Sequence, residues 1–459
     1  MARVPTLSRR RGTTAPGSLG FPLRVRRRWS FPPAGVPRCW RWSLPSSWLW
    51  LALLVGVAIP IPVTLKGFEA VGPETAWPLI WVLVAASGML IAQLARASWP
   101  LALGFGYVIY RTWWTGFPQR SLEVLALTVC GVLLYLAALR VPRSLEAWAA
   151  RVILAGAGIN AALGLWNLTA RLRPERWQLV THLEVIVRGQ RHWVELPWGP
   201  LSFQHPAYPF QLVREGFLGL PTGLFPHPNE FGLFLALVLP LIAWAVGRAW
   251  LRWGLVGLGG ALVGLSQSRI ALVAVVVMAL CRLRPAGRWL AAGGTALAAA
   301  LGGAVLWGGP ATTLGGRLPV WWAAWDWLWE RNPVWGIGWG LWKVWALWPN
   351  GPVWTGSPRH GLPGQARMSA WWTEAQGEPM QLVFELGIVG LAVGLWWAIS
   401  AGREGWGVFR HGDGLGRAWV LVLIGAGVCL WMAPVFRTPQ TAVLVLFALG
   451  RVRARARTG

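Results

Sequence analysis

Charged residues are scarce in this sequence. Only 13% of its 459 residues are Asp, Glu, Lys or Arg, whereas a soluble domain carries about 25%. Acidic residues are the scarcer kind, with 16 against 42 basic ones. The mean hydropathy is +0.48, and apolar runs long enough to span a bilayer recur along the chain. The composition therefore excludes an ordinary soluble domain and predicts a polytopic helical membrane protein.

Cysteine is also rare. The spacing of the four cysteines matches no metal motif. Cys39 lies in the basic N-terminal segment, and Cys130, Cys281 and Cys429 lie within apolar runs. The long segments between the runs contain none, so no disulfide supports them. A Walker loop, a zinc signature and a nucleophile elbow are missing as well. These absences argue against a metal site and against a phosphate-binding loop for a nucleotide.

The net charge of +26 is concentrated outside the apolar runs. Ten arginines and no acid lie between Arg3 and Arg41, and the last ten residues contain four more arginines. Basic flanks of this kind orient membrane spans and attract anionic lipid, so we expect membrane lipids as partners and no nucleic acid. We predict a basic, disordered cytoplasmic segment over 1–46 and a basic cytoplasmic tail over 451–459.

Twelve apolar runs predict twelve membrane spans within a membrane domain over 47–450. They lie at about 47–65, 75–95, 98–110, 121–139, 147–167, 229–247, 252–267, 269–282, 288–308, 380–400, 417–436 and 439–450. With both termini in the cytoplasm, 26 basic residues fall on the cytoplasmic side and five in short external loops, in agreement with the positive-inside rule. The predicted class is all-α, with a large extracytoplasmic loop at 309–379 between spans 9 and 10 and another long external segment at about 168–228.

Several polar residues fall at the external surface in this topology. His227 and Asn229 lie in Gly223–Gly232 (GLFPHPNEFG), at the entrance to a span, where an unpaired polar group is costly. Arg269 separates two apolar runs, and Arg317 opens the large loop. The planar fork of arginine suits a phosphate, but an arginine at a membrane surface also serves as an interfacial anchor. The residues alone leave both interpretations open.

Three polar residues share one helical face where the tenth span begins: Glu378, Gln381 and Glu385. A carboxylate inside a span must pair with a cation or take up a proton. Glu385 is therefore either half of a structural ion pair or a general base that faces an outer-leaflet cavity. The tryptophan-rich segment Val320–Glu330 predicts a short amphipathic helix on the membrane surface.

Four segments, in order over about 220–395, resemble the O-antigen ligase and polymerase superfamily. They are GLFPHPNEFGLFLALVLPL, LSQSRIAL, GGRLPVWWAAWDWLWERNPVWGIGWG and EPMQLVFELGIVGL. The resemblance implies transfer of a glycan from undecaprenyl pyrophosphate to lipid A–core or another acceptor hydroxyl, at the outer face of the bacterial inner membrane, with no metal or cofactor. It assigns pyrophosphate binding to Arg269 and Arg317. The implied partners are the lipid-linked glycan and an acceptor glycolipid or glycan.

The sequence departs from this family where the large loop closes. The family has a His-Asn pair there, whose histidine is its proposed catalytic residue, and this chain has Gln376-Gly377. Because glutamine cannot act as a general base, the function must fall to another residue. The candidates are Glu378, Glu374, His360 and His227.

The substrate-binding candidates extend beyond the two arginines. Asn229 and Gln381 lie in the matching segments, and Arg214 is the nearest counterpart of an arginine that the family carries before its Pro-Asn segment.

Two alternatives to a ligase stay open. The first is a repeat-unit polymerase on the same scaffold. The second is a non-catalytic transporter or assembly subunit for lipid-linked glycan, which the missing histidine favours. Transporters often contain paired broken helices in two related halves, and no such symmetry is evident in the sequence.

Overall fold

The computed structural model describes most of the chain after residue 83. The described ranges are 84, 87–113, 118–168, 177–180, 182–187, 190–195, 201–204, 212–214, 220–225, 227–282, 314–342, 377–433, 435–436 and 438–458. For 113, 118–123, the strands between 177 and 214, 314–319 and 439, only the backbone is described. All of these residues belong to one unit of the chain, Ser46–Gly459. They are predominantly helical, which confirms the predicted helical class.

Six helices in the first part of this unit fall on predicted apolar runs. Three of them precede a set of short strands: α4 (Trp99–Trp113), α5 (Pro118–Arg140) and α6 (Arg143–Leu168). Three follow it: α7 (Pro228–Ala245), α8 (Ala249–Leu265) and α9 (Arg269–Arg282). The polar interruption at 266–268 separates α8 from α9, as the sequence predicted.

Four helices are described in the last part of the chain. They are α11 (Leu314–Trp329), α14 (Glu378–His411), α15 (Gly414–Leu430) and α16 (Pro439–Thr458). The helix predicted over Val320–Glu330 is present within α11. Helix α14 is longer than the run that predicts it, and α16 continues through the arginine-rich segment that we expected as a separate tail.

Three described helices are long and apolar enough to cross a membrane: α6, α7 and α14. Shorter apolar helices cover Val124–Arg140, Ala249–Leu265 and Gly414–Leu430. These lengths and compositions support membrane association. The predicted spans at 47–65 and 288–308 lie outside the described residues, as does most of 75–95, so the total of twelve stays a prediction.

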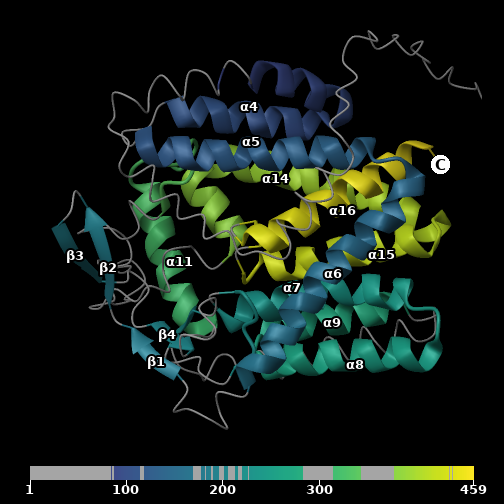
Figure 1. Ribbon diagram of the computed structural model, residues 1–459. Coiled ribbons are helices and arrows are strands. Elements are labelled where there is room, and N and C mark those ends of the chain that lie inside the picture. Colours follow the sequence, from purple (N-terminus) through teal and green to yellow (C-terminus); the bar gives the residue numbers. More distant parts are fainter. Residues whose placement is uncertain are drawn as a thin grey trace, which may run out of the picture. The chain divides into compact units, whose positions relative to one another are not determined.

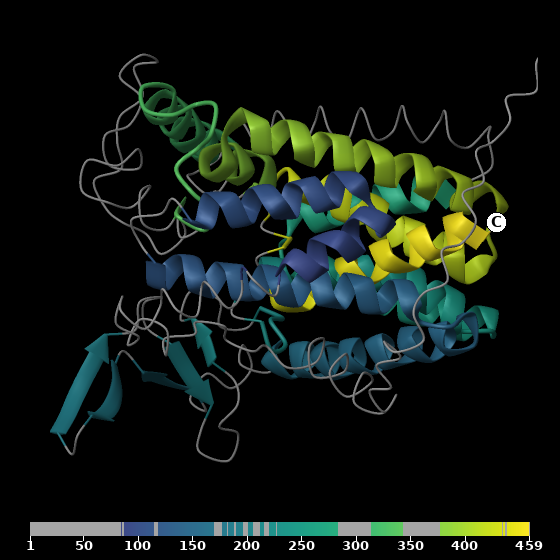
Figure 2. The ribbon, with the colours of Figure 1, turned by 90° about the horizontal axis from the view of Figure 1, so that it is seen from above.

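Helix α7 is the most enclosed of the three. Its residues from Phe231 to Leu241 are all buried, and it contacts α6, α8, α9, α15 and α16. Among the other helices, α4 lies against α5 and α14, and α16 lies against α5, α14 and α15 (Figures 1 and 2). A helix that is apolar on all sides is buried by protein or by lipid, and here protein covers most of it.

Five short strands follow α6, in the segment expected as an external loop. Strands β1 (Trp177–Val180), β4 (Leu201–Gln204) and β5 (Leu212–Arg214) form an antiparallel sheet in the order β1-β4-β5. Strands β2 (His182–Val187) and β3 (Gln190–Glu195) form a separate hairpin. The sequence did not predict these strands.

A buried carboxylate ties α6 to α16. Glu146 is fully buried and accepts from Arg451 Nη2 at 2.9 Å and from Arg455 Nε at 2.9 Å. The indole N–H of Trp419 donates to the same carboxylate at 2.8 Å. Arg455 also reaches Asp413, before α15, at 2.7 Å. The basic end of the chain is therefore part of the packed structure as well as a source of surface charge.

Candidate functional site

The Pro-His-Pro-Asn segment begins helix α7. His227 is the N-cap residue, and its Nδ1 accepts a hydrogen bond from Asn229 N at 3.0 Å. Pro228 occupies the first helical position, where a missing N–H costs nothing. Asn229 is exposed, whereas Phe231 behind it is completely buried. The structure thus gives His227 a capping role, in which Nδ1 is the acceptor.

Two asparagines of α6 hold the turn that leads into α7. Asn167 Oδ1 accepts from Gly223 N at 3.0 Å, and Asn160 Oδ1 accepts from Leu224 N at 3.1 Å. Gly223 has a φ of 57°, and an added Cβ would come within 2.8 Å of the Asn160 carbonyl oxygen. The sequence interpretation missed both asparagines, although their spacing of seven residues puts them on one face of an apolar helix.

The turn between α8 and α9 packs against the first turn of α7. Gly232 faces Ser266 and Ser268, and a Cβ at Gly232 would overlap the Ser266 hydroxyl. Ser266 Oγ donates to Val263 O at 2.7 Å, which fixes the end of α8. Arg269 is the first residue of α9 and is exposed beside this turn. The starts of α7 and α9 therefore lie at the same end of the bundle.

The start of α14 lies at this end as well. The Cys429 thiol approaches Ile270 O at 4.0 Å, which links the end of α15 to the start of α9. An added Cβ at Gly377 would come within 2.7 Å of Trp431 O, at the end of α15. Glu378 Oε1 accepts from Phe436 N at 2.8 Å, in the turn between α15 and α16.

Helices α7, α9, α14 and α16 consequently all begin in one layer. A helix start carries a partial positive charge and presents free N–H groups, which favour an anion. We call this region the helix-start layer and define it by Pro228, Arg269, Glu378 and Pro439.

Helix α14 is interrupted about two and a half turns after its start. Gly387 has a φ of 68° and a ψ of −169°, which breaks the helical hydrogen-bond ladder. The segment Asn332–Trp342 pairs with the break through four backbone bonds: Ile337 N to Phe384 O (3.0 Å), Gly338 N to Glu385 O (2.9 Å), Ile388 N to Pro333 O (3.0 Å) and Val389 N to Val334 O (3.3 Å). Irregular backbone in an apolar helix needs such partners, because lipid offers none.

Glu385 lies at this break and is fully buried. Its carboxylate accepts from Gly340 N at 2.9 Å, from Trp342 N at 3.2 Å and from Gln381 Nε2 at 3.0 Å. Gln381, which we expected to bind substrate, is itself buried and donates to this carboxylate. Through these contacts, Glu385 and Gln381 support Asn332–Trp342, which lies within the predicted external loop at 309–379.

Two residues of α4, absent from the predicted site, complete the support. Arg111 Nη2 donates to Gly336 O at 2.8 Å, and the Tyr107 hydroxyl donates to Leu386 O at 2.9 Å. Arg111 was expected in a short external loop with no further role. No sequence spacing signals these contacts, since they join positions more than 220 residues apart.

The tryptophans of α11 divide into packed and exposed ones. Trp327 stacks on Phe384 with ring centroids 5.6 Å apart, and Arg331 lies over the same indole at 4.0 Å. Trp322 and Trp329 are exposed. An exposed indole ring offers an apolar face to lipid or to a sugar.

The remaining predicted site residues are described less fully. Arg317 lies in the first turn of α11 and Arg214 ends β5, but the side chains of both are outside the described residues. His360, Glu374 and Gln376 lie entirely outside them. In the part of the chain that the structure describes, no three His, Cys, Asp or Glu side chains gather to hold a metal ion.

Comparison with known proteins adds no family assignment. No family model matches the chain, and no curated protein matches it either. Any function must therefore rest on the sequence segments and on the helix-start layer.

Proposed function

We propose that this chain is an integral membrane glycosyltransferase of the O-antigen ligase type. It would transfer a glycan from undecaprenyl pyrophosphate to a hydroxyl of lipid A–core or another acceptor. In this proposal the helix-start layer faces the outside of a bacterial inner membrane, and both termini lie in the cytoplasm. The observation that carries the proposal is the common location of four helix starts with Arg269 at one of them.

The chemistry needs charge stabilisation more than it needs a cofactor. The acceptor oxygen bonds to the anomeric carbon, and the bond from that carbon to the pyrophosphate oxygen breaks. Undecaprenyl pyrophosphate leaves with the bonding electrons, so a new negative charge develops on its oxygen. Arg269 and Arg317 would bind this group, helped by the helix starts, because fixed donors stabilise charge that develops in a transition state.

The proton of the acceptor hydroxyl must go to a base. Glu378 is our first candidate, since it lies in the helix-start layer and is held there through Phe436 N. His227 would have to use Nε2, because Nδ1 accepts from Asn229 N. His360 is the third candidate. Asn229, Arg214 and Gln381 complete the proposed substrate contacts, with Gln381 acting through Glu385.

A purified full-length protein, given lipid-linked glycan and candidate acceptors, tests the proposal directly. The measurement is release of undecaprenyl pyrophosphate together with glycosylated acceptor. We expect Arg269→Ala and Arg317→Ala each to lower the rate about 100-fold, the loss typical of one transition-state donor. Arg403→Ala, an exposed arginine near the other end of α14, is the matched control and should leave the rate unchanged.

Full activity in both variants would rule out the pyrophosphate clamp. A reporter placed within 309–379 that proves cytoplasmic would overturn the proposed orientation. A repeat-unit polymerase would give the same release, with a second lipid-linked repeat as the acceptor.

One observation favours a transporter or assembly subunit as the second candidate. Helix α14 is broken at Gly387, and broken helices line the substrate sites of many transporters. Movement of lipid-linked glycan across vesicles without release of undecaprenyl pyrophosphate would decide for this candidate.

A further inference from the structure

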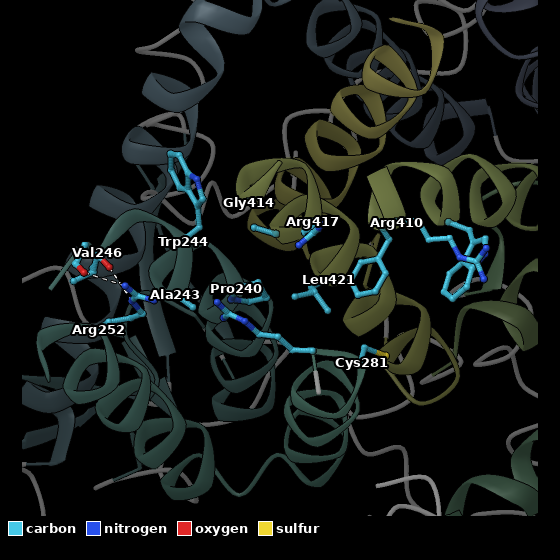
Figure 3. A pocket seen from close by; sticks show the side chains of 15 residues that line it. Pro240, Ala243, Trp244, Val246, Arg252, Cys281, Arg410, Gly414, Arg417 and Leu421 are labelled. Atoms are coloured by element: carbon cyan, nitrogen blue, oxygen red, sulfur yellow. Dashed lines mark hydrogen bonds between the residues drawn. The ribbon is translucent and has the colours of Figure 1, made fainter. Parts of the chain in front are cut away.

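A cavity of about 670 Å³ lies at the opposite end of the helices from the helix-start layer. Residues near the ends of α7, α9 and α14 and near the starts of α8 and α15 line it (Figure 3). The glycan site proposed above does not include it.

Four arginines from four helices line this cavity, and no acidic side chain does among the described residues. They are Arg252, Arg282, Arg410 and Arg417. Figure 3 shows Arg252, Arg410 and Arg417 around the space. Cations drawn together without a carboxylate raise the local positive potential, which attracts an anion.

Two of the four guanidinium groups already have partners. Arg252 donates to Val246 O and Gly247 O, both at 2.9 Å, and so satisfies carbonyls where α7 ends. Arg410 lies over the Trp406 ring at 4.7 Å. Arg282 and Arg417 are exposed, and within the described ranges neither side chain has a hydrogen bond or an ion pair. These two are the groups available to a ligand.

The rest of the lining is apolar. Pro240 and Ala243 come from α7, Cys281 from α9 and Leu421 from α15, while Trp406 is 50% exposed at the edge. A small soluble anion would contact the arginines alone. A phospholipid would contact both parts, with its phosphate at the arginines and its acyl chain on the apolar wall.

We propose that this cavity binds an anionic phospholipid, with Arg282 and Arg417 as the phosphate ligands. Basic pockets between membrane helices are suited to such headgroups, and aromatic residues such as Trp406 are typical of the membrane–water interface. The proposal does not depend on the glycosyltransferase function, because neither arginine belongs to that site. If arginines at this end served only to set the orientation of the protein in the membrane, substitution of those that line the cavity and of those outside it should have the same effect on lipid binding.

The test uses the full chain in detergent and native mass spectrometry. Dioleoyl phosphatidylglycerol is the probe, and dioleoyl phosphatidylcholine is the comparison lipid. We expect selective retention of phosphatidylglycerol, about 25-fold weaker in Arg282→Gln/Arg417→Gln and about fivefold weaker in Arg282→Gln alone. Arg248→Gln/Arg403→Gln is the control, because both arginines are exposed at this end and neither lines the cavity. Its binding should stay within twofold of the parent.

Two results would overturn the proposal. An equal loss of phosphatidylglycerol binding in the two double variants would show that general surface charge causes the binding. Displacement of phosphatidylglycerol by glycerol 1-phosphate at equal concentration would identify a site for a soluble anion. The single variant keeps the test valid if the double variant does not fold.

Discussion

Glu146 and Glu385 are both completely buried, yet their surroundings differ. Glu146 is held by the guanidinium groups of Arg451 and Arg455, which join α6 to α16. Glu385 is held by the backbone amides of Gly340 and Trp342 and by the amide side chain of Gln381. The first arrangement fixes two regular helices together. The second shapes irregular backbone, and so the comparison separates a charge that joins helices from a charge that organises a loop.

The largest expected effect comes from neutralising Glu146. In Glu146→Gln, the buried Arg451 loses its only charged partner among the described residues, while the half-buried Arg455 keeps Asp413. Removal of one partner from a buried ion pair costs about 3–5 kcal/mol. The measurement is thermal unfolding of the detergent-solubilised protein. Glu404→Gln is the control, since the pair Arg453–Glu404 is partly exposed and should contribute about 0–1 kcal/mol. Equal losses in the two variants would contradict the role assigned to Glu146.

The same substitution at Glu385 should have a smaller and more local effect. Glu385→Gln keeps one acceptor oxygen but turns an NH₂ group toward a backbone amide, and loss of one hydrogen bond to a charged group costs about 1.5–3 kcal/mol. Hydrogen exchange should become faster at the amides of Gly340 and Trp342. In Glu146→Gln, exchange at these two amides should change only as much as the lower global stability requires. If exchange changed equally at all amides in both variants, the two glutamates would not differ in role.

A glycine pair within α14 tests the irregular backbone itself. Gly387 has a φ of 68°, and an added Cβ would overlap the Val334 carbonyl, so Gly387→Ala should destabilise the protein by about 1–3 kcal/mol. Gly402 has open space around its Cβ position, and Gly402→Ala should be neutral or stabilising by up to about 1 kcal/mol. Thermal unfolding of the two variants compares them directly. A stable Gly387→Ala protein would mean that the break is dispensable.

The smallest effect concerns Asp413, the exposed partner of Arg455. Partial burial raises its pKa, but the hydrogen bond from the Gly416 amide and the charge of the Arg455 guanidinium lower it by more, so the net pKa lies below 3.8. A depressed carboxyl pKa stabilises the fold above the unfolded value and loses that contribution as pH falls through the folded value. Asp413→Asn should therefore cost about 0–1 kcal/mol at pH 6.5, and less at pH 3.5. A difference that grows on acidification would refute this assignment.

Much of the helical architecture could be predicted because apolar runs are local signals. The polar interruption before Arg269 correctly predicted the junction of α8 and α9. The His-Pro-Asn segment also contains a helix-start pattern, with proline at the first position, but we assigned it to the substrate site without its capping role. The strands were missed, because short strands among turn residues carry a weak signal.

Contacts between residues far apart in the chain could not be predicted from the sequence. Arg451 looked like an orientation charge, and only its pairing with Glu146, 305 residues away, explains why it is 2% exposed. The glycines around 336–340 and at 387 were visible, but nothing in the pattern indicated that the two segments pair with each other. Spacing predicts which residues share a face, whereas partners on separate elements require the packed structure.

The burial of α7 has a consequence for how the chain is assembled. Its residues from Phe231 to Leu241 all end up covered, in part by α15 and α16, which are synthesised much later. In the proposed membrane topology, these side chains are apolar on every side, so lipid can surround α7 before those helices are made. Lipid then serves as its temporary partner, and the later helices displace that lipid when they arrive.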